Sequence, residues 1–328
     1  MSSDFPTDPA ARPGQSWVAR PPGPEYPPPG AAPFHWREWI LPSFLLLATI
    51  LSTTYAGLFY VAGDVGLIRM LFSVASHPHL LLQGASFSFT IVMILLAHEM
   101  GHFLACRHYG IRCTPPYFLP LPISIAGTMG AFIRIKSPFQ SKRALFDVGI
   151  AGPLAGFVFV VPALIVGIAY STLIPKGSIA GDIAFGEPLL FRWIGAAVLG
   201  YSPEAQDMIA QPIAMAAWFG LLATSLNLFP IWQLDGGHIA YAVLGREPQK
   251  RISIIATVIL VLVSFAGWPI PSYLLFAVLI LIFGLRSRFY HPPTLFDDED
   301  IGTGRRVLGV AALLILIVSF TPVPIYLA

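Results

Sequence analysis

Two histidines and a glutamate stand close together near the end of a long apolar stretch. His98 and His102 are four residues apart, and Glu99 directly follows the first histidine. On a helix this spacing puts both imidazoles on one face, about 6 Å apart along the axis, so they can converge on one metal ion. The pattern is typical of H-E-x-x-H zinc sites. In such sites zinc lowers the pKa of a bound water to about 7, and the glutamate takes its proton as the water attacks a carbonyl.

The apolar surroundings favour this interpretation over a set of polar residues satisfied by neighbouring helices. A charged side chain near the centre of a bilayer costs about 2.5–3.5 kcal/mol even on a lenient insertion scale, so such residues are functional by default. His102 lies five residues before Arg107, which is about 8 Å along a helix. We therefore expect a metal site within the membrane but nearer the cytoplasm, which water reaches through a polar cavity.

Other metal-binding side chains near this pattern fit it poorly. Cys106 continues the face of His98, but eight residues span about 12 Å of helix and a zinc coordination sphere only about 4 Å. We expect Cys106 to be buried as a small apolar residue, and His108 to lie off the face at the interface. Cys106 and Cys113 predict no disulfide framework.

A third ligand is needed to complete a tetrahedral catalytic site. Asp235 is the first candidate, because it follows Pro230, which interrupts the helix, and precedes two glycines that permit close backbone approach or a left-handed turn. Broken helices are tolerated at membrane depth where they line a cavity. Two alternatives remain. Asp147 follows Arg143 at helical spacing, which favours an ion pair, and His238 lies beyond the glycines.

The composition predicts a multi-pass membrane protein. Hydrophobic residues make up 55% of the 328 residues and charged residues 11%, against about a quarter in soluble domains. A net charge of +2 gives no indication of nucleic acid as a partner. Residues 1–36 are rich in proline and polar side chains, which predicts a disordered cytoplasmic tail before a membrane domain at 37–328 with a catalytic core at about 84–245.

Seven stretches are candidate transmembrane helices, so the expected fold is an all-α bundle. They are residues 39–62, 83–106, 145–173, 208–229, 252–268, 273–285 and 307–320. Lysine and arginine, which mark the cytoplasmic side, concentrate in 107–143, 246–251 and 286–306, whereas Arg69, Lys176 and Arg192 fall in the opposite loops. This alternation predicts a cell-membrane protein with a cytoplasmic N-terminus and its C-terminus outside.

One stretch between these helices has the period of a strand. In residues 131–136, two isoleucines at 133 and 135 alternate with basic side chains at 134 and 136. Gly127 and Gly130 bracket a plausible turn. We expect a small β-hairpin on the cytoplasmic side. Its open edge cannot face lipid, so it lies at the interface or lines a cavity.

Several motifs carry a resemblance to a known family. HEMGH inside a predicted transmembrane helix, followed by N-x-x-P-x-x-x-L-D-G-G, resembles the site-2 protease family of intramembrane zinc metalloproteases. GTMGAF and AGPLAG are similar to the family's hairpin glycines and its third core helix, although packing through small residues also explains AGPLAG. The resemblance covers about residues 87–237. The chain differs from some members in having no PDZ insertion.

The resemblance implies a role for each matching residue. One zinc ion per chain is bound by His98, His102 and Asp235, and Glu99 is the base. The substrate backbone is held by Asn227 together with the hairpin glycines, Gly127 and Gly130.

We therefore expect an intramembrane zinc metalloendopeptidase that cleaves transmembrane segments of other membrane proteins within the lipid bilayer. Two other functions are considered. A metal transporter would usually carry several buried polar groups along a path, often in related halves, and a catalytically silent scaffold would not need an intact H-E-x-x-H pattern.

Overall fold

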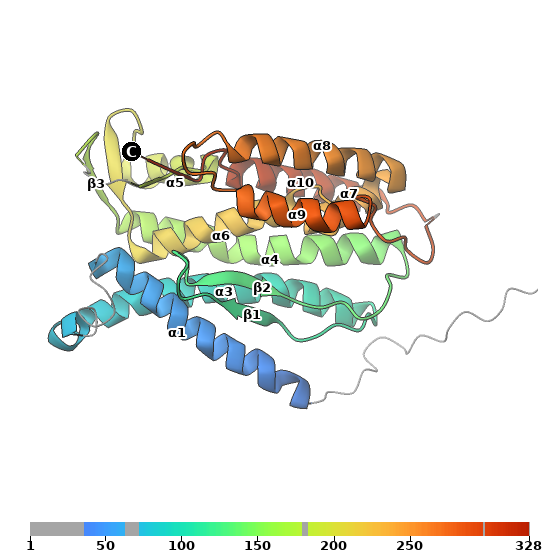
Figure 1. Ribbon diagram of the computed structural model, residues 1–328, viewed down its shortest axis with the longest axis horizontal. Helices are drawn as coiled ribbons and strands as arrows, with labels where there is room; N and C mark the ends of the chain where they lie inside the picture. Colours follow the sequence, from blue (N-terminus) through green and yellow to red (C-terminus); the bar gives the residue numbers. More distant parts are fainter. Residues whose placement is uncertain (1–35, 63–71, 179–182, 298, 328) are drawn as a thin grey trace, which may run out of the picture.

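The computed structural model describes residues 36–62, 72–178, 183–297 and 299–327 (Figure 1). The chain is mostly helical, as expected, with a few short strands. The described part opens with the 3-10 helix η1 (Trp36–Trp39). The predicted tail at 1–36 therefore lies almost wholly outside the described residues.

Three helical segments in the described part of the chain are long and apolar enough to cross a membrane. They contain α1 (Ile40–Ala62), α3 (His79–His108) and α4 (Lys142–Ala169). Each coincides with one of the predicted spans. Large apolar side chains such as Phe44 and Leu51 on α1 are about two-thirds exposed, as expected for a face that contacts lipid rather than water.

Shorter helices make up the rest of the bundle. Their bounds are α5 (Leu189–Leu199), α6 (Pro212–Leu228), α7 (Asp235–Leu244), α8 (Arg246–Ser264), α9 (Leu274–Arg286) and α10 (Thr303–Ser319). The last four predicted spans coincide with α6, α8, α9 and α10, which have 13 to 19 residues. That these four cross the membrane stays a prediction.

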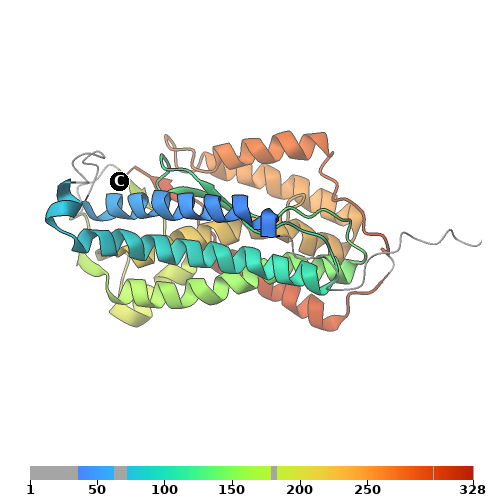
Figure 2. The ribbon, with the colours of Figure 1, turned by 90° about the horizontal axis from the view of Figure 1, so that it is seen from below.

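The helices form three layers (Figure 1). α4 and α6 lie in the middle, with α1 and α3 on one side and α7 to α10 on the other. Seen from below, α1 and α3 run side by side in front of α4 (Figure 2). The main core lies where α3, α4 and α6 meet, around side chains such as Phe87, Val160 and Trp218.

Local sequence signals explain where these helices begin and end. Ser141 caps α4, where its hydroxyl oxygen accepts a hydrogen bond from the amide of Ala144 at 3.3 Å. Pro212 stands in the first turn of α6, where its missing N–H costs nothing. α6 ends two residues before Pro230, whose ring prevents the helix from continuing.

A β-hairpin is present beside α3, but the alternating residues 133–136 that predicted its strand lie after β2. β1 (Tyr117–Pro120) pairs antiparallel with β2 (Thr128–Phe132), and an isolated bridge joins Cys113 to Ile135. The prediction that Gly127 and Gly130 bracket the turn is wrong, because the connection is longer and Gly130 lies within β2. Gly127 ends this connection against α1, where a Cβ would stand 2.5 Å from the carbonyl oxygen of Ser52.

Two further strand pairs were not predicted. β3 (Thr172–Pro175) pairs with β5 (Gln206–Ile209), and β4 (Ala184–Phe185) pairs with β6 (Ile325–Tyr326). All of them are too short to show a clear period in the sequence. They lie at the end of the bundle that carries the C-terminus, opposite the loop between α3 and α4 (Figure 1).

Candidate metal centre

The two histidines of the H-E-x-x-H pattern lie in the C-terminal half of α3. His98, Glu99 and His102 are all buried there, at 5–6% exposure. The imidazole rings meet edge to face at an interplanar angle of 72°, with their Nε2 atoms 3.1 Å apart. The helical spacing therefore brings both side chains to one point, as the sequence predicted.

Asp235 reaches the same point from the first residue of α7. Its Oδ2 lies 3.1 Å from Nε2 of His98 and its Oδ1 3.3 Å from Nε2 of His102. The ligand atoms of the three residues all lie within 4.8 Å of one another. Two imidazoles and a carboxylate that converge in this way form a donor set that zinc prefers.

A backbone carbonyl fixes the protonation of His102. Nδ1 of His102 lies 2.7 Å from the carbonyl oxygen of Val148 on α4. Because that oxygen can only accept, Nδ1 carries the proton and Nε2 of the neutral ring keeps its lone pair for a metal. This is the usual arrangement around a histidine ligand, so the residues present fit a zinc ion.

Glycines of the AGPLAG segment let α4 come close to the histidines. A Cβ on Gly152 would stand 2.1 Å from Nε2 of His102, and one on Gly156 would stand 3.3 Å from Cβ of His98. A Cβ on Gly101 of α3 would stand 2.4 Å from the carbonyl oxygen of Ala151. The small residues thus serve helix packing, as expected, and they also leave room for the imidazole of His102.

The backbone before Asp235 is irregular because α6 ends at Leu228. The amide of Trp232 donates to the hydroxyl of Ser253 on α8 at 2.8 Å, with Trp232 at a φ of 45°. A Cβ on Gly236 would stand 2.0 Å from the carbonyl oxygen of Leu228. Of the two roles weighed for the glycine pair, the structure shows close backbone approach.

A cavity of about 190 Å³ opens beside the three residues. It is lined by the candidate ligands, by Glu99 and Asn227, and by part of the hairpin. The side-chain amide nitrogen of Asn227 lies 3.2 Å from Nε2 of His98. The hairpin contributes residues 131–133 and Ile135, whereas Gly127 and Gly130 are not among the lining residues.

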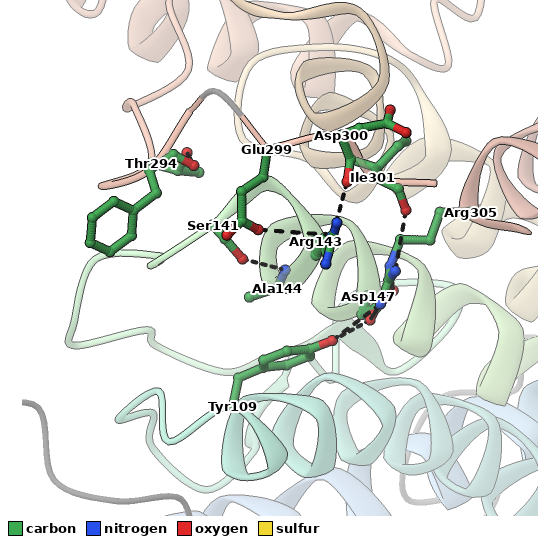
Figure 3. Close-up of polar contacts among 11 residues, drawn as sticks. Tyr109, Ser141, Arg143, Ala144, Asp147, Thr294, Glu299, Asp300, Ile301 and Arg305 are labelled. Atoms are coloured by element: carbon green, nitrogen blue, oxygen red, sulfur yellow. Dashed lines mark hydrogen bonds and ion pairs between the residues drawn. The ribbon is translucent and has the colours of Figure 1, made fainter. Parts of the chain in front are cut away.

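The alternative ligand Asp147 is engaged elsewhere (Figure 3). Arg305 at the start of α10 donates two hydrogen bonds of 2.7 Å to its carboxylate, and the hydroxyl of Tyr109 donates a third. The expected ion pair with Arg143 is therefore wrong. Arg143 instead donates to the carbonyl oxygen of Asp300 at 2.8 Å.

The other alternative, His238, lines the cavity without joining the candidate ligands. Its Nδ1 lies 2.6 Å from Nε2 of His291, which stands in the loop between α9 and α10. His291 has no sequence pattern around it that would have found it. As expected, Cys106 is buried in an apolar cluster and His108 is exposed at the end of α3.

The fold and the site together define a helical membrane protein with a candidate metal centre of the H-E-x-x-H type. The chain belongs to peptidase family M50, the family of the site-2 proteases, because residues 86–267 match its family model. This match covers more than half of the chain and contains all the candidate ligands.

Curated relatives carry related names. The chain is 31% identical over 243 residues to the probable zinc metalloprotease EGY1, chloroplastic, of Arabidopsis thaliana, which covers 72% of this chain and 42% of that protein. It is 28% identical over 280 residues to EGY2 of the same plant, covering 81% of this chain and 50% of that protein. The chain thus spans half or less of the length of these relatives. No solved structure gives a significant match.

Proposed function

We propose that this chain is an intramembrane zinc metalloendopeptidase that cleaves transmembrane segments of other membrane proteins. The observation that supports it most is the convergence of His98, His102 and Asp235 on one point at the wall of a cavity that also contains Glu99. The similar plant proteins are named probable zinc metalloproteases, and this agrees with the donor set.

Each residue of the site has a chemical task in this proposal. Zinc held there would polarise a substrate carbonyl and lower the pKa of a water molecule. Glu99 follows His98 and lines the cavity, so its carboxylate is placed to accept a proton from that water. Asn227 offers a side-chain amide beside His98, where it can hold the substrate backbone.

A transmembrane substrate must be unwound before it can be cut, because its amides are bonded within its own helix. β2 is paired only with β1 among the described strands, so its other edge is free to pair with an extended segment. We propose that this edge receives the unwound substrate as an added strand. Residues next to and within β2 line the cavity, which brings such a strand close to Glu99.

We further propose that the protein lies in the cell membrane with the N-terminus in the cytoplasm and the C-terminus outside. The loops between α3 and α4 and between α9 and α10 lie at the same end of the bundle (Figure 1), and both are rich in basic residues. The positive-inside rule assigns that end to the cytoplasm.

Transport of metal ions has weaker support. Among the described residues, one group of three or more side chains could hold a metal ion. A transport path would usually need several such groups along the membrane normal. A single group beside an acidic residue fits hydrolysis better.

The test is to replace the proposed base, Glu99, and to measure zinc content and cleavage separately. Purified Glu99→Gln protein should keep one zinc ion per chain and lose cleavage of a transmembrane test substrate, because an amide cannot accept the proton. Glu204→Gln, which changes an exposed glutamate at the other end of the bundle, is the matched control and should cleave normally. Full cleavage by Glu99→Gln would overturn the mechanism, and loss of zinc would give Glu99 a structural role instead.

A further inference from the structure

A pair of histidines stands at the wall of the cavity and has no role in the proposed hydrolysis. His238 comes from the first turn of α7, and His291 from the loop before α10. His291 is 2% exposed. The ring of His238 contacts the rings of Phe139 and His291, with centroids 5.7 Å and 4.8 Å away. Packing against these two rings holds His238 in place.

Hydrogen bonds fix the proton positions in this pair. Nδ1 of His291 donates to the carbonyl oxygen of Pro292 at 2.6 Å, because a carbonyl can only accept. Burial lowers the pKa of His291 to about 4, so the ring is neutral and its Nε2 has a lone pair. That lone pair faces Nδ1 of His238 at 2.6 Å, so His238 must be the donor.

The remaining nitrogen of His238 follows from this order. With the proton on Nδ1, Nε2 of the neutral ring is a hydrogen-bond acceptor. Nε2 has no hydrogen-bond partner among the described residues, and His238 lines the cavity. The pair thus holds one fixed, uncharged acceptor on a residue that lines the cavity beside the candidate metal ligands.

An unwound peptide brings the complementary group. Each residue of an extended segment carries one N–H and one carbonyl, and an N–H left without an acceptor away from water is costly. A neutral acceptor cannot bind a substrate carbonyl. His238 also stands outside the group of three side chains whose ligand atoms converge, so its lone pair is not committed to the candidate metal site. A backbone N–H of the substrate is therefore the partner that fits Nε2 of His238.

We propose that His238 positions the substrate by accepting a hydrogen bond from a backbone N–H of the unwound segment, and that His291 fixes the tautomer that makes this possible. The inference rests on the proposed function for its cleavage readout. It assigns the His238–His291 pair to peptide binding rather than to metal binding.

The experiment compares peptide substrates in which one backbone N–H near the scissile bond is replaced by an ester oxygen. In the wild-type protein, one ester position should lower kcat/KM by about tenfold to 100-fold, which is the usual effect of leaving one buried polar partner unsatisfied. His238→Leu should lower kcat/KM of the amide substrate by a similar factor, mainly through KM, and should be insensitive to that ester. His238→Gln restores an acceptor oxygen and should recover most of the loss.

Controls separate binding from folding and from metal loss. All variants should keep normal zinc and thermal stability, and His79→Leu, a change of an exposed histidine, should cleave like the wild type. His291→Leu should weaken cleavage of the amide substrate because the tautomer of His238 is no longer fixed. Equal amide-to-ester ratios in wild type and His238→Leu, or loss of zinc in His238→Leu, would overturn the inference.

Binding to an inactive protein keeps this test independent of cleavage. In a Glu99→Gln background, the Kd of the amide peptide should rise about tenfold to 100-fold on His238→Leu, and the ester peptide should bind both proteins with the weaker Kd. This pattern without any cleavage by the wild type would sink the protease proposal and leave the peptide site standing. Cleavage by the wild type, with the same Kd of the amide peptide before and after His238→Leu, would overturn the peptide site and leave the protease proposal standing.

Discussion

Substitution of Gly152 by alanine should damage the candidate metal site without touching a ligand. The new Cβ would lie 2.1 Å from Nε2 of His102 and 2.4 Å from Cε1. The new Cβ and Nε2 of His102 must move apart from 2.1 Å to the 3.4 Å of ordinary van der Waals contact, which is a shift of about 1.3 Å. His102 cannot slide freely, because its Nδ1 is bonded to the carbonyl of Val148.

The size of this shift decides the outcome. Zinc–nitrogen bonds hold near 2.0–2.1 Å with a tolerance of about 0.2 Å, so a displaced His102 is lost as a ligand. Changes in the residues that merely support zinc ligands cost about 10–100-fold in affinity. We therefore expect Gly152→Ala to weaken zinc binding by at least about 100-fold. Overpacking should also cost about 1–3 kcal/mol of stability, partly offset by the better helix propensity of alanine.

The assay is zinc content after dialysis against graded chelator, with thermal unfolding in detergent as a check on folding. Gly156→Ala is the matched control on the same face of α4, because its Cβ would stand 3.3 Å from His98 and needs little adjustment. It should keep zinc within a few-fold of wild type. In a His102→Ala background the stability cost of Gly152→Ala should disappear. Normal zinc binding by Gly152→Ala would refute the reasoning.

Three further outcomes are expected. Asp235→Ala should lose zinc and cleavage whereas Asp147→Ala keeps zinc; metal analysis showing the opposite would mean that the wrong carboxylate had been assigned. Arg305→Met should lower the free energy of unfolding by about 1–3 kcal/mol, since it removes two charge-assisted hydrogen bonds, whereas the exposed Arg143→Met should cost under about 1 kcal/mol; equal melting of the two variants would contradict this. In sealed vesicles a thiol reagent should label Ser178→Cys only from outside, and labelling only from the cytoplasmic face would invert the proposed topology.

Local patterns predicted the parts of the fold that depend on local physics. Long apolar stretches predicted the positions of α1, α3 and α4, the three helices in the described part of the chain that are long and apolar enough to cross a membrane. They did not predict α7, which is short and lies outside the expected spans. The strand period indicated a hairpin in this region, but the alternating residues 133–136 lie after β2, and the turn was placed wrongly. Gly130 lies within β2 with a φ of 104°, in a strand pair whose register shifts, and a glycine can mark such an irregularity in a strand as well as a turn. The strands at the other end have two to four residues and depend on pairing across the chain.

Long-range partners were the part of the site that the sequence could not specify. Helical spacing suggested Arg143 for Asp147, but the partner is Arg305, 158 residues further along the chain. His291 is likewise distant along the chain from its partner His238, and it lies in a loop without any sequence motif. Asp235, by contrast, could be ranked first because few acidic residues share its depth and its broken helix.

The distance along the chain between the candidate ligands has a consequence for biosynthesis. His98 and Asp235 are 137 residues apart, which corresponds to roughly 7 to 27 s of translation at about 5–20 residues per second. Through that interval α3 is already made and α7 is not, so the ribosome-bound chain holds the histidines and the glutamate without their carboxylate partner. Under the proposed function, a newly made chain therefore cannot act on neighbouring membrane proteins until Asp235 has been added to it.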